Sequence, residues 1–250
     1  MNVLVFDLES DYAHFRKFYT TSSPLTFAFP PRTALQGIVG AILGYSKDEY
    51  IERLKDACIS VSLNNPIKKM RVPLNFVNTK DAPPVTISKL KAYFLGLRKA
   101  KWHEPHTQIR LEIVKKPSYR VYFYSPTNQV MTALFQLLNT HKCVYVPYLG
   151  IANFISNFHF LGEYEASIIK GNNEAIEVLS PIKIKGLLQE EFLVLEEGKV
   201  YFRERMPIQL KKDRTPAAYG TYLFEPNGKS IKARVKEYVK IKGIGNFVWM

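Results

Sequence analysis

The order in which strand-like and helix-like apolar spacing alternates along the first 165 or so residues constrains the fold most. Residues 30–43 and 128–139 carry helical spacing, and residues 48–56 suggest a further short helix. The strand-like segments are, in chain order, residues 2–8, 57–63, 107–114, 119–124, 143–146 and 158–169. This β-α-β-β-α-β order predicts an α+β fold with a ferredoxin-like, split βαβ plan, which RNA-recognition modules also use.

A long interruption separates the second strand-like segment from the third. Residues 64–105 contain five prolines and nine lysine or arginine residues without a regular apolar pattern. A structureless loop of this length is improbable inside a compact domain unless it is functional. We therefore expect an RRM-like domain at residues 1–169, with an extended, basic, partly hairpin-like insertion at about residues 64–105. Residues 170–250 are expected to form a smaller β-rich C-terminal domain.

The start of the first helix has features of a phosphate site. Pro30 and Pro31 precede it, and proline is favoured in a first helical turn because its missing N–H had no partner there. Gly44 follows the helix and suits its C-terminal end. The free N–H groups and partial positive charge of a helix N-terminus suit a docked phosphate. Arg32 and Thr33 are thus candidate phosphate ligands; the alternative is an exposed arginine without a role.

The charge of the chain points to a polyanionic partner. Thirty-five Lys and Arg residues stand against 22 Asp and Glu residues, which gives a formal net charge of +13. Such an excess usually serves nucleic acid or an anionic membrane, although a protein can also be merely basic. Two isolated cysteines indicate a reducing compartment. The N-terminus does not resemble a signal peptide, and no apolar run is long enough to span a bilayer. We expect a cytoplasmic protein with no cofactor and no membrane partner.

Residues 231–242 alternate so closely that they predict one strand. Five cations and Tyr238 would share one face, and mostly apolar residues would share the other. Such a row matches the spacing of a phosphate backbone. A solvated edge strand, whose lysines block aggregation, is the alternative.

Signals for catalysis are weak. The chain lacks HExxH, P-loop and GxSxG motifs and has no carboxylate-rich cluster. A metal-independent ribonuclease would need a general base near a 2′-hydroxyl and a cation on the phosphate, which Tyr45, Lys101 and His106 could supply. In the alternative reading, His106 binds RNA or caps a turn.

Three segments, in order, resemble the Cas five family of CRISPR-associated proteins (RAMP superfamily). Residues 30–44 read PPRTALQGIVGAILG and are similar to the family's first helix. Residues 106–110, HTQIR, lead into residues 116–122, KPSYRVY, which are similar to the strand pair after the family's thumb. Residues 145–150, YVPYLG, resemble a further family element. Residues 6–17 most resemble the type I-B branch.

The resemblance implies a non-catalytic subunit of a type I CRISPR Cascade complex. Such a subunit holds the 5′ handle of the CRISPR guide RNA (crRNA) and contacts the Cas seven backbone subunit and a Cas eight-type large subunit. The insertion would be the family's thumb. The residues expected to bind RNA are Arg16, Lys17, Tyr19, Arg32, Thr33, Arg71, Lys101, Trp102, His106, Gln108, Arg110 and Tyr148.

Two rival functions remain open at this point. The family's type I-C branch cleaves precursor guide RNA with a tyrosine, a lysine and a histidine. Tyr45 lies near the family tyrosine, but Lys101 is followed by Trp102 rather than by histidine. A generic basic interaction protein without RNA preference is the third reading.

Overall fold

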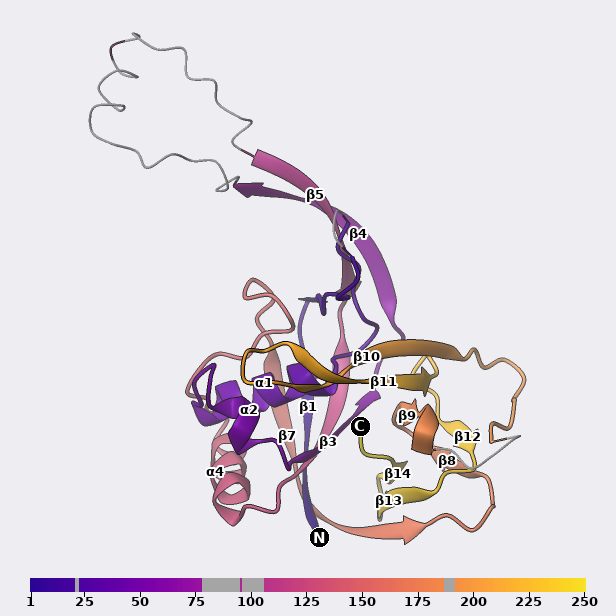
Figure 1. The fold of residues 1–250 in the computed structure, drawn as a ribbon. Coiled ribbons are helices and arrows are strands. Elements are labelled where there is room, and N and C mark those ends of the chain that lie inside the picture. The colour runs from indigo at the N-terminus through magenta and orange to yellow at the C-terminus, as the bar shows by residue number, and fades with distance from the viewer. Residues whose placement is uncertain (21–22, 78–94, 96–105, 187–191) are drawn as a thin grey trace.

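A six-stranded antiparallel sheet forms the centre of the molecule in the computed structural model (Figure 1). The structure describes residues 1–20, 23–77, 95, 106–186 and 192–250. The strands lie in the order β14-β13-β7-β1-β6-β3. Their bounds are β1 Asn2–Glu9, β3 Cys58–Leu63, β6 Ser118–Tyr124, β7 Asn157–Lys170, β13 Glu237–Ile241 and β14 Gly245–Phe247. The architecture is thus mixed α and β, mostly strands, with a curled antiparallel sheet.

The alternation of side chains along β1 divides the core between the two faces of this sheet. Leu4, Phe6 and Leu8 are buried on one face, together with residues of the helices. Val3 and Val5 are buried on the other face, in a cluster that includes Tyr122 and Phe247. Because successive strand residues point to opposite faces, one apolar strand serves both layers.

Two helices cover the first face. Helix α1 spans Arg32–Leu43 and helix α4 spans Asn128–Asn139, as their apolar spacing predicts. Gly44 ends α1 in the left-handed conformation at φ 78°, which is the predicted stop. Helix α2 is shorter than predicted and comprises only Tyr50–Arg53. None of the helices in the described part of the chain is long and apolar enough to cross a membrane.

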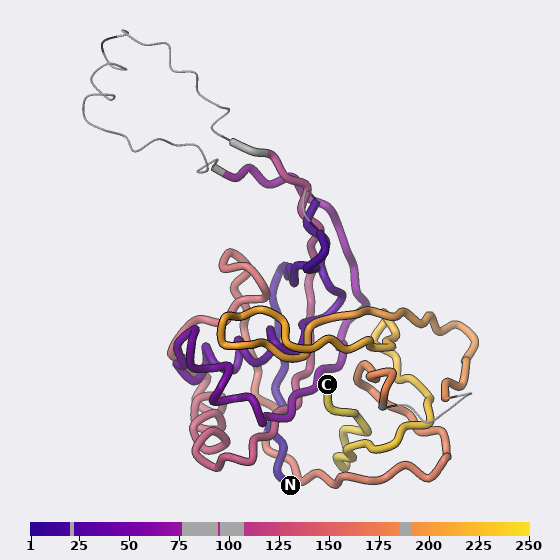
Figure 2. Tube along the Cα trace, viewed as in Figure 1, coloured from indigo at the N-terminus to yellow at the C-terminus, as the bar shows by residue number. Residues whose placement is uncertain are grey.

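A two-stranded arm projects from the body, as both views of the chain show (Figures 1 and 2). Strands β4, Lys68–Val77, and β5, His106–Lys115, pair over ten residues. The short strand β2, Tyr12–Ala13, joins β5 at the base of the arm. Within the expected hairpin-like projection, residues 68–77 form a regular strand. Residues 78–94 and 96–105 lie outside the described residues.

The C-terminal part adds two small sheets, ordered β10-β11-β9 and β12-β8. Their elements are β8 Ile176–Val178, β9 Ile182–Lys183, the 3₁₀ turn Ile184–Gly186, β10 Phe202–Leu210, β11 Pro216–Phe224 and β12 Ile231–Ala233. Met206, Tyr222 and Phe224 are buried in the same core cluster as α1, and β13 pairs with β7. The C-terminal residues therefore share the core and extend the sheet of the N-terminal part. The expected domain boundary at residue 169 falls inside β7, where Ile169 pairs with Tyr238 of β13.

The prediction of one strand over residues 231–242 is wrong. Strand β12 pairs with β8, whereas β13 pairs with β7 in the central sheet. Between them the chain changes partner, and the N–H of Arg234 donates to the carbonyl of Phe192. The sequence alternates without interruption between β12 and β13 because Val235 and Val239 are both buried. They belong to different core clusters. The cations of this segment are consequently divided between two sheets.

The strand predicted for residues 143–146 is also absent. The N–H groups of Val144 and Tyr145 donate to the carbonyls of Ile42 and Ala41 at 3.1 and 3.0 Å. These carbonyls belong to the last turn of α1, whose final carbonyls have no partner within the helix. The segment caps a helix instead of extending a sheet, which explains why its apolar side chains are exposed.

Candidate nucleic-acid interface

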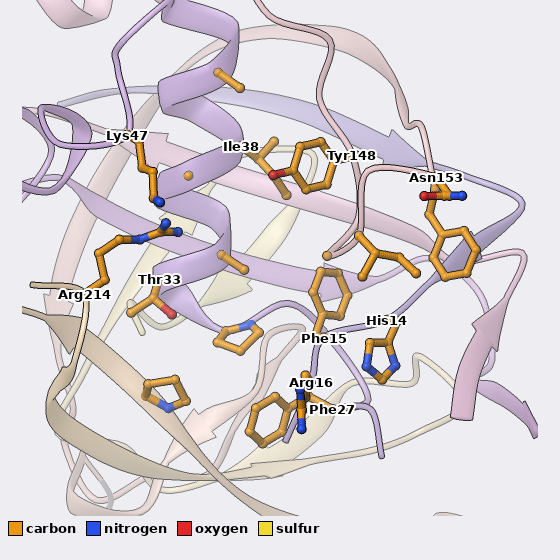
Figure 3. Close-up of a pocket in the computed structure, with 18 of the residues that line it drawn as sticks. His14, Phe15, Arg16, Phe27, Thr33, Ile38, Lys47, Tyr148, Asn153 and Arg214 are labelled. Carbon is orange, nitrogen blue, oxygen red and sulfur yellow. The ribbon is translucent and has the colours of Figure 1, made fainter. Parts of the chain in front are cut away.

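An open groove of about 1320 Å³ runs along one side of α1 (Figure 3). Five parts of the chain enclose it: the segment at residues 14–31, α1, one face of the β4–β5 arm, the loop at residues 145–154, and the hairpin of β10 and β11. The lining residues range from His14 to Arg214 and are brought together from distant parts of the sequence. The groove is consequently a product of the tertiary fold.

Helix α1 forms the floor of the groove through Thr33, Gly37, Ile38 and Ala41. These positions follow one another at helical spacing, so they share one face. Thr33 is buried and is the only member with a hydroxyl group. The small residues Gly37 and Ala41 leave open space above the helix.

The loop at residues 145–154 is held against the body by its own backbone. The N–H of His14 donates to the carbonyl of Leu149 at 3.0 Å, and the N–H of Leu149 donates to the carbonyl of Phe154 at 2.9 Å. Gly150 has φ 95°, and a Cβ there would lie 1.8 Å from the carbonyl oxygen of His14. Only glycine fits this position. The fixed loop presents Tyr148, which is 45% exposed, to the groove (Figure 3).

The charged lining of the groove is positive. Arg16, Lys47 and Arg214 line it, and the residues that line it in the described part of the chain include no Asp or Glu. Figure 3 shows Lys47 and Arg214 directed into the same space beside α1. Arg16 is held by a hydrogen bond from its guanidinium to the carbonyl of Thr20 at 3.0 Å. A groove with this charge favours an anionic ligand.

Aromatic side chains make up much of the remaining surface. They come from the N-terminal segment, the end of α1, the arm and the loop: Phe15, Tyr45, Phe76, Tyr145, Tyr148 and Phe154. Flat rings interleaved with cations are the combination that single-stranded nucleic acids require, because bases stack on rings while cations neutralise phosphates.

His14 lies in the wall of the groove and is almost fully buried. Its Nδ1 contacts the carbonyl oxygen of Glu112 at 2.7 Å. Burial lowers the pKa of His14, and the positive charge of Arg16 acts in the same direction. The imidazole is therefore neutral at pH 7 and donates this hydrogen bond from Nδ1.

The structure brings four of the sequence-predicted site residues together. Arg16, Thr33, Tyr45 and Tyr148 all line the groove. The ring of Tyr45 also carries the guanidinium of Arg53 at 4.7 Å from its centroid. Lys101 and Trp102 lie outside the described residues, and His106 is described only through its backbone, at the start of β5.

Lys17 and Arg32 lie nearby but have partners inside the protein. The ammonium of Lys17 forms an ion pair with Glu204; burial opposes its charge, but the hydrogen bond to Glu204 prevails and raises its pKa. The guanidinium of Arg32 donates to the carbonyls of Ile208, Lys55 and Ala57 at 3.1, 3.1 and 2.7 Å. The structure thus gives both cations a role in fastening β10 to the body.

Arg71, Gln108 and Arg110 are exposed on the arm, on the face that points away from the groove. Cross-strand pairing joins Arg71 with Glu112 and Pro73 with Arg110. Leu74 and Ile109 line the groove, and the strand period of two places their neighbours on the opposite face. Tyr19 also lies outside the groove lining, where its ring meets that of Phe18.

Sequence reasoning missed Lys47, Arg214 and His14. Lys47 lies four residues beyond Leu43, the last residue of α1, and could have been found from that position. Arg214 lies in the turn KKDR between two strands, a basic turn that the sequence shows but does not connect to α1. Among the described residues, no group of three His, Cys, Asp or Glu side chains is arranged to hold a metal ion.

Comparisons with known proteins agree with this fold. The family model described as CRISPR-associated protein (Cas_Cas5) matches residues 3–126. A CRISPR protein from Archaeoglobus fulgidus is similar in structure, with a TM-score of 0.57 at 13% identity, and the alignment covers 100% of both chains. A chain of a CRISPR RNA-guided surveillance complex reaches a TM-score of 0.51 at 13% identity, covering 92% of this chain and 91% of that one.

A chain of a type III-B Cmr-beta complex bound to cognate target RNA also has a TM-score of 0.51, at 13% identity, covering 93% of this chain and 86% of that one. No curated protein sequence matches this chain. At such identities the structural likeness concerns the fold alone. The family match covers the N-terminal half of the chain, up to residue 126.

Proposed function

We propose that this chain, as the Cas five family member that its family match supports, is a non-catalytic, guide-RNA-binding subunit of a type I CRISPR Cascade complex. It binds the 5′ handle of crRNA and caps the Cas seven backbone, close to a Cas eight-type large subunit. The type I-B branch remains our assignment from the sequence resemblance. The strand order β7-β1-β6-β3, with α1 and α4 in the two crossovers, supports an RRM-like reading of the N-terminal part.

The groove beside α1 is the observation that carries this proposal. Its lining combines aromatic rings with Arg16, Lys47 and Arg214 and includes no carboxylate among the described residues. Single-stranded RNA offers both bases for the rings and phosphates for the cations. Arg71 and Arg110 lie on the opposite face of the arm, so they would contact a part of the RNA that lies outside the groove.

Binding of a repeat-containing guide RNA to the purified protein tests the proposal. Tyr148→Ala and Arg16→Ala should each weaken binding, since the first removes a stacking surface worth about 1–3 kcal/mol and the second a phosphate contact. Lys240→Ala, which removes an exposed cation of β13, is the matched control. If the groove variants bind as tightly as the control, the groove is not the RNA site.

Incubation of the same RNA with the protein in EDTA tests the non-catalytic part separately. We expect intact RNA. Cleavage at a single site that Tyr45→Phe abolishes would assign the protein to the metal-independent endoribonucleases instead. Competition with unrelated RNA distinguishes handle recognition from generic basic binding.

A further inference from the structure

The hairpin of β10 and β11 runs across α1 (Figure 1). Its aromatic and basic residues are not among those that the sequence predicted to bind RNA. The hairpin is firmly attached to the body. Glu204 of β10 accepts the N–H of Ala28 at 2.9 Å and pairs with Lys17, and Met206 is completely buried. The surface that the hairpin presents is therefore fixed in position.

Three aromatic rings meet on the outer side of this hairpin. The rings of Phe18 and Tyr219 have centroids 4.8 Å apart, and those of Phe18 and Tyr19 have centroids 5.1 Å apart. Phe18 is 48% exposed and Tyr19 is 58% exposed, which is unusual for such large apolar groups in mutual contact. Tyr219 is paired across the strands with Pro207, which lines the groove. The rings thus form a platform at the rim of the groove.

A cation contacts this platform. The guanidinium of Arg205 lies 4.9 Å from the centroid of the Tyr219 ring. Five basic residues lie in β10 and in the turn that follows it, namely Arg203, Arg205, Lys211, Lys212 and Arg214. The two acidic residues of the same segment are both engaged: Glu204 pairs with Lys17, and Asp213 accepts the N–H and hydroxyl of Thr215 at 2.9 and 2.6 Å.

We propose that the platform of Phe18, Tyr19 and Tyr219, with Arg205 and the basic turn, binds nucleotides of single-stranded RNA that leave the groove. The inference rests on the proposed function and extends it to a second site. Stacked rings accept any base, and Arg205 already shows that a planar cation settles on Tyr219. Arg214 lines the groove and belongs to the basic turn, so a phosphate backbone can pass from one site to the other without leaving positive charge.

The test measures the affinity of a fluorescein-labelled oligouridine for the full chain by anisotropy. Tyr219→Leu should raise the Kd about tenfold, whereas Tyr219→Phe, which keeps the ring, should bind like the unaltered protein. Phe18→Ala removes an exposed ring and serves as a second variant with little risk to folding, which circular dichroism checks. Lys240→Ala combined with Lys242→Ala controls for loss of charge elsewhere.

The outcomes separate this inference from the proposed function. If Tyr219→Leu and Phe18→Ala bind normally while Tyr148→Ala binds weakly, the platform is not an RNA site and the groove assignment stands. If none of the three loses affinity, both ideas fail. If RNA binding is unchanged but a co-expressed Cascade subunit no longer co-purifies with Tyr219→Leu, the platform docks a protein, which overturns the inference. With 5-iodouridine in the probe, photocrosslinks should map to Phe18, Tyr19 or Tyr219.

Discussion

Single side chains in this protein have roles that their chemical type alone does not reveal. Arg32 is the clearest case, because a guanidinium at the start of a helix suits a phosphate but here bonds to three carbonyls of two other segments. Burial lowers its pKa, yet an arginine stays charged under all ordinary conditions. Its fork of donors thus joins β10 to the end of α2 and the start of β3.

Replacement of Arg32 by alanine should destabilise the protein. Two half-buried carbonyls and one exposed carbonyl would lose a charged donor, which predicts a loss of about 3 kcal/mol in the free energy of unfolding. Urea denaturation measures this. Lys47→Ala provides the matched comparison, since Lys47 is exposed and lines the groove; it should lower RNA affinity and leave stability unchanged. Equal stability of the two variants would contradict the structural role of Arg32.

His14 should make stability depend on pH. Its pKa is lowered in the folded state, chiefly by burial, so the unfolded chain binds the proton more tightly. The contribution is fully present above about pH 6.5 and is lost as the pH falls below that value. The charges near the ring are those of Arg16 and Glu112.

A His14→Gln variant separates this effect from other titrations. Glutamine can still donate to the carbonyl of Glu112 but does not titrate. The fall of Tm between about pH 8 and about pH 5 should therefore be shallower in the variant than in the unaltered protein. Parallel curves would show that His14 does not contribute to the pH dependence.

The position of several elements in this fold is set by backbone contacts with other segments of the chain. The loop at residues 145–154 has no helix or long strand, yet backbone hydrogen bonds to α1 and to His14 fix both of its sides. The arm likewise owes its direction to the ten-residue pairing of β4 with β5 and to the short strand β2 at its base. These contacts set the positions of two walls of the groove.

Gly150→Ala should disturb this loop severely. The added Cβ would meet the carbonyl oxygen of His14 at 1.8 Å, and the position has φ 95°. We expect a loss of at least about 3 kcal/mol in stability, because the backbone of the loop or of residue 14 must move. Thermal unfolding measures the change.

Gly198→Ala is the matched control. Gly198 also has a positive φ, of 73°, but nothing lies within 4 Å of an added Cβ. Only the conformational strain remains, which predicts a loss of about 1 kcal/mol. If both variants lost the same stability, the close approach of Gly150 to His14 would not explain its presence.

At the scale of the whole molecule, net charge and charge placement are different quantities. The formal charge is +13, but Lys17 is paired internally and Arg32 is bonded to carbonyls, so neither is free for a ligand in this structure. The cations that line the groove share it with aromatic rings, and its lining includes no carboxylate among the described residues. This arrangement suits single-stranded RNA better than an evenly basic surface would.

Guide-RNA affinity should fall steeply with salt. If about six phosphates are contacted, the plot of log affinity against log salt concentration should have a slope of roughly −4. Removal of Lys47 and Arg214 together should make the slope shallower by about one or more, because each lost contact no longer releases counterions. If the RNA affinity of the unaltered protein did not change with salt concentration, binding through phosphate contacts would be excluded.

The sequence determined those features that depend on local order. Apolar spacing placed α1 and α4 at the residues where they lie, Gly44 marked the end of α1, and residues 64–105 marked the arm. These features follow from side-chain period and from the backbone preferences of Pro and Gly, which neighbouring residues alone decide. The strand predictions for residues 231–242 and 143–146 were wrong because alternation of apolar residues does not specify a pairing partner.

Only the tertiary structure decided which residues form the groove and which charges remain available in it. Arg214 and Lys47 meet because the hairpin of β10 and β11 crosses α1, and Arg71 turns away from the groove because of the register of the arm. Contacts between segments more than a hundred residues apart depend on strand register and packing, which have no local signature in the chain. The sequence could therefore supply the types of residue that the proposed RNA site uses, but not the surface that they form.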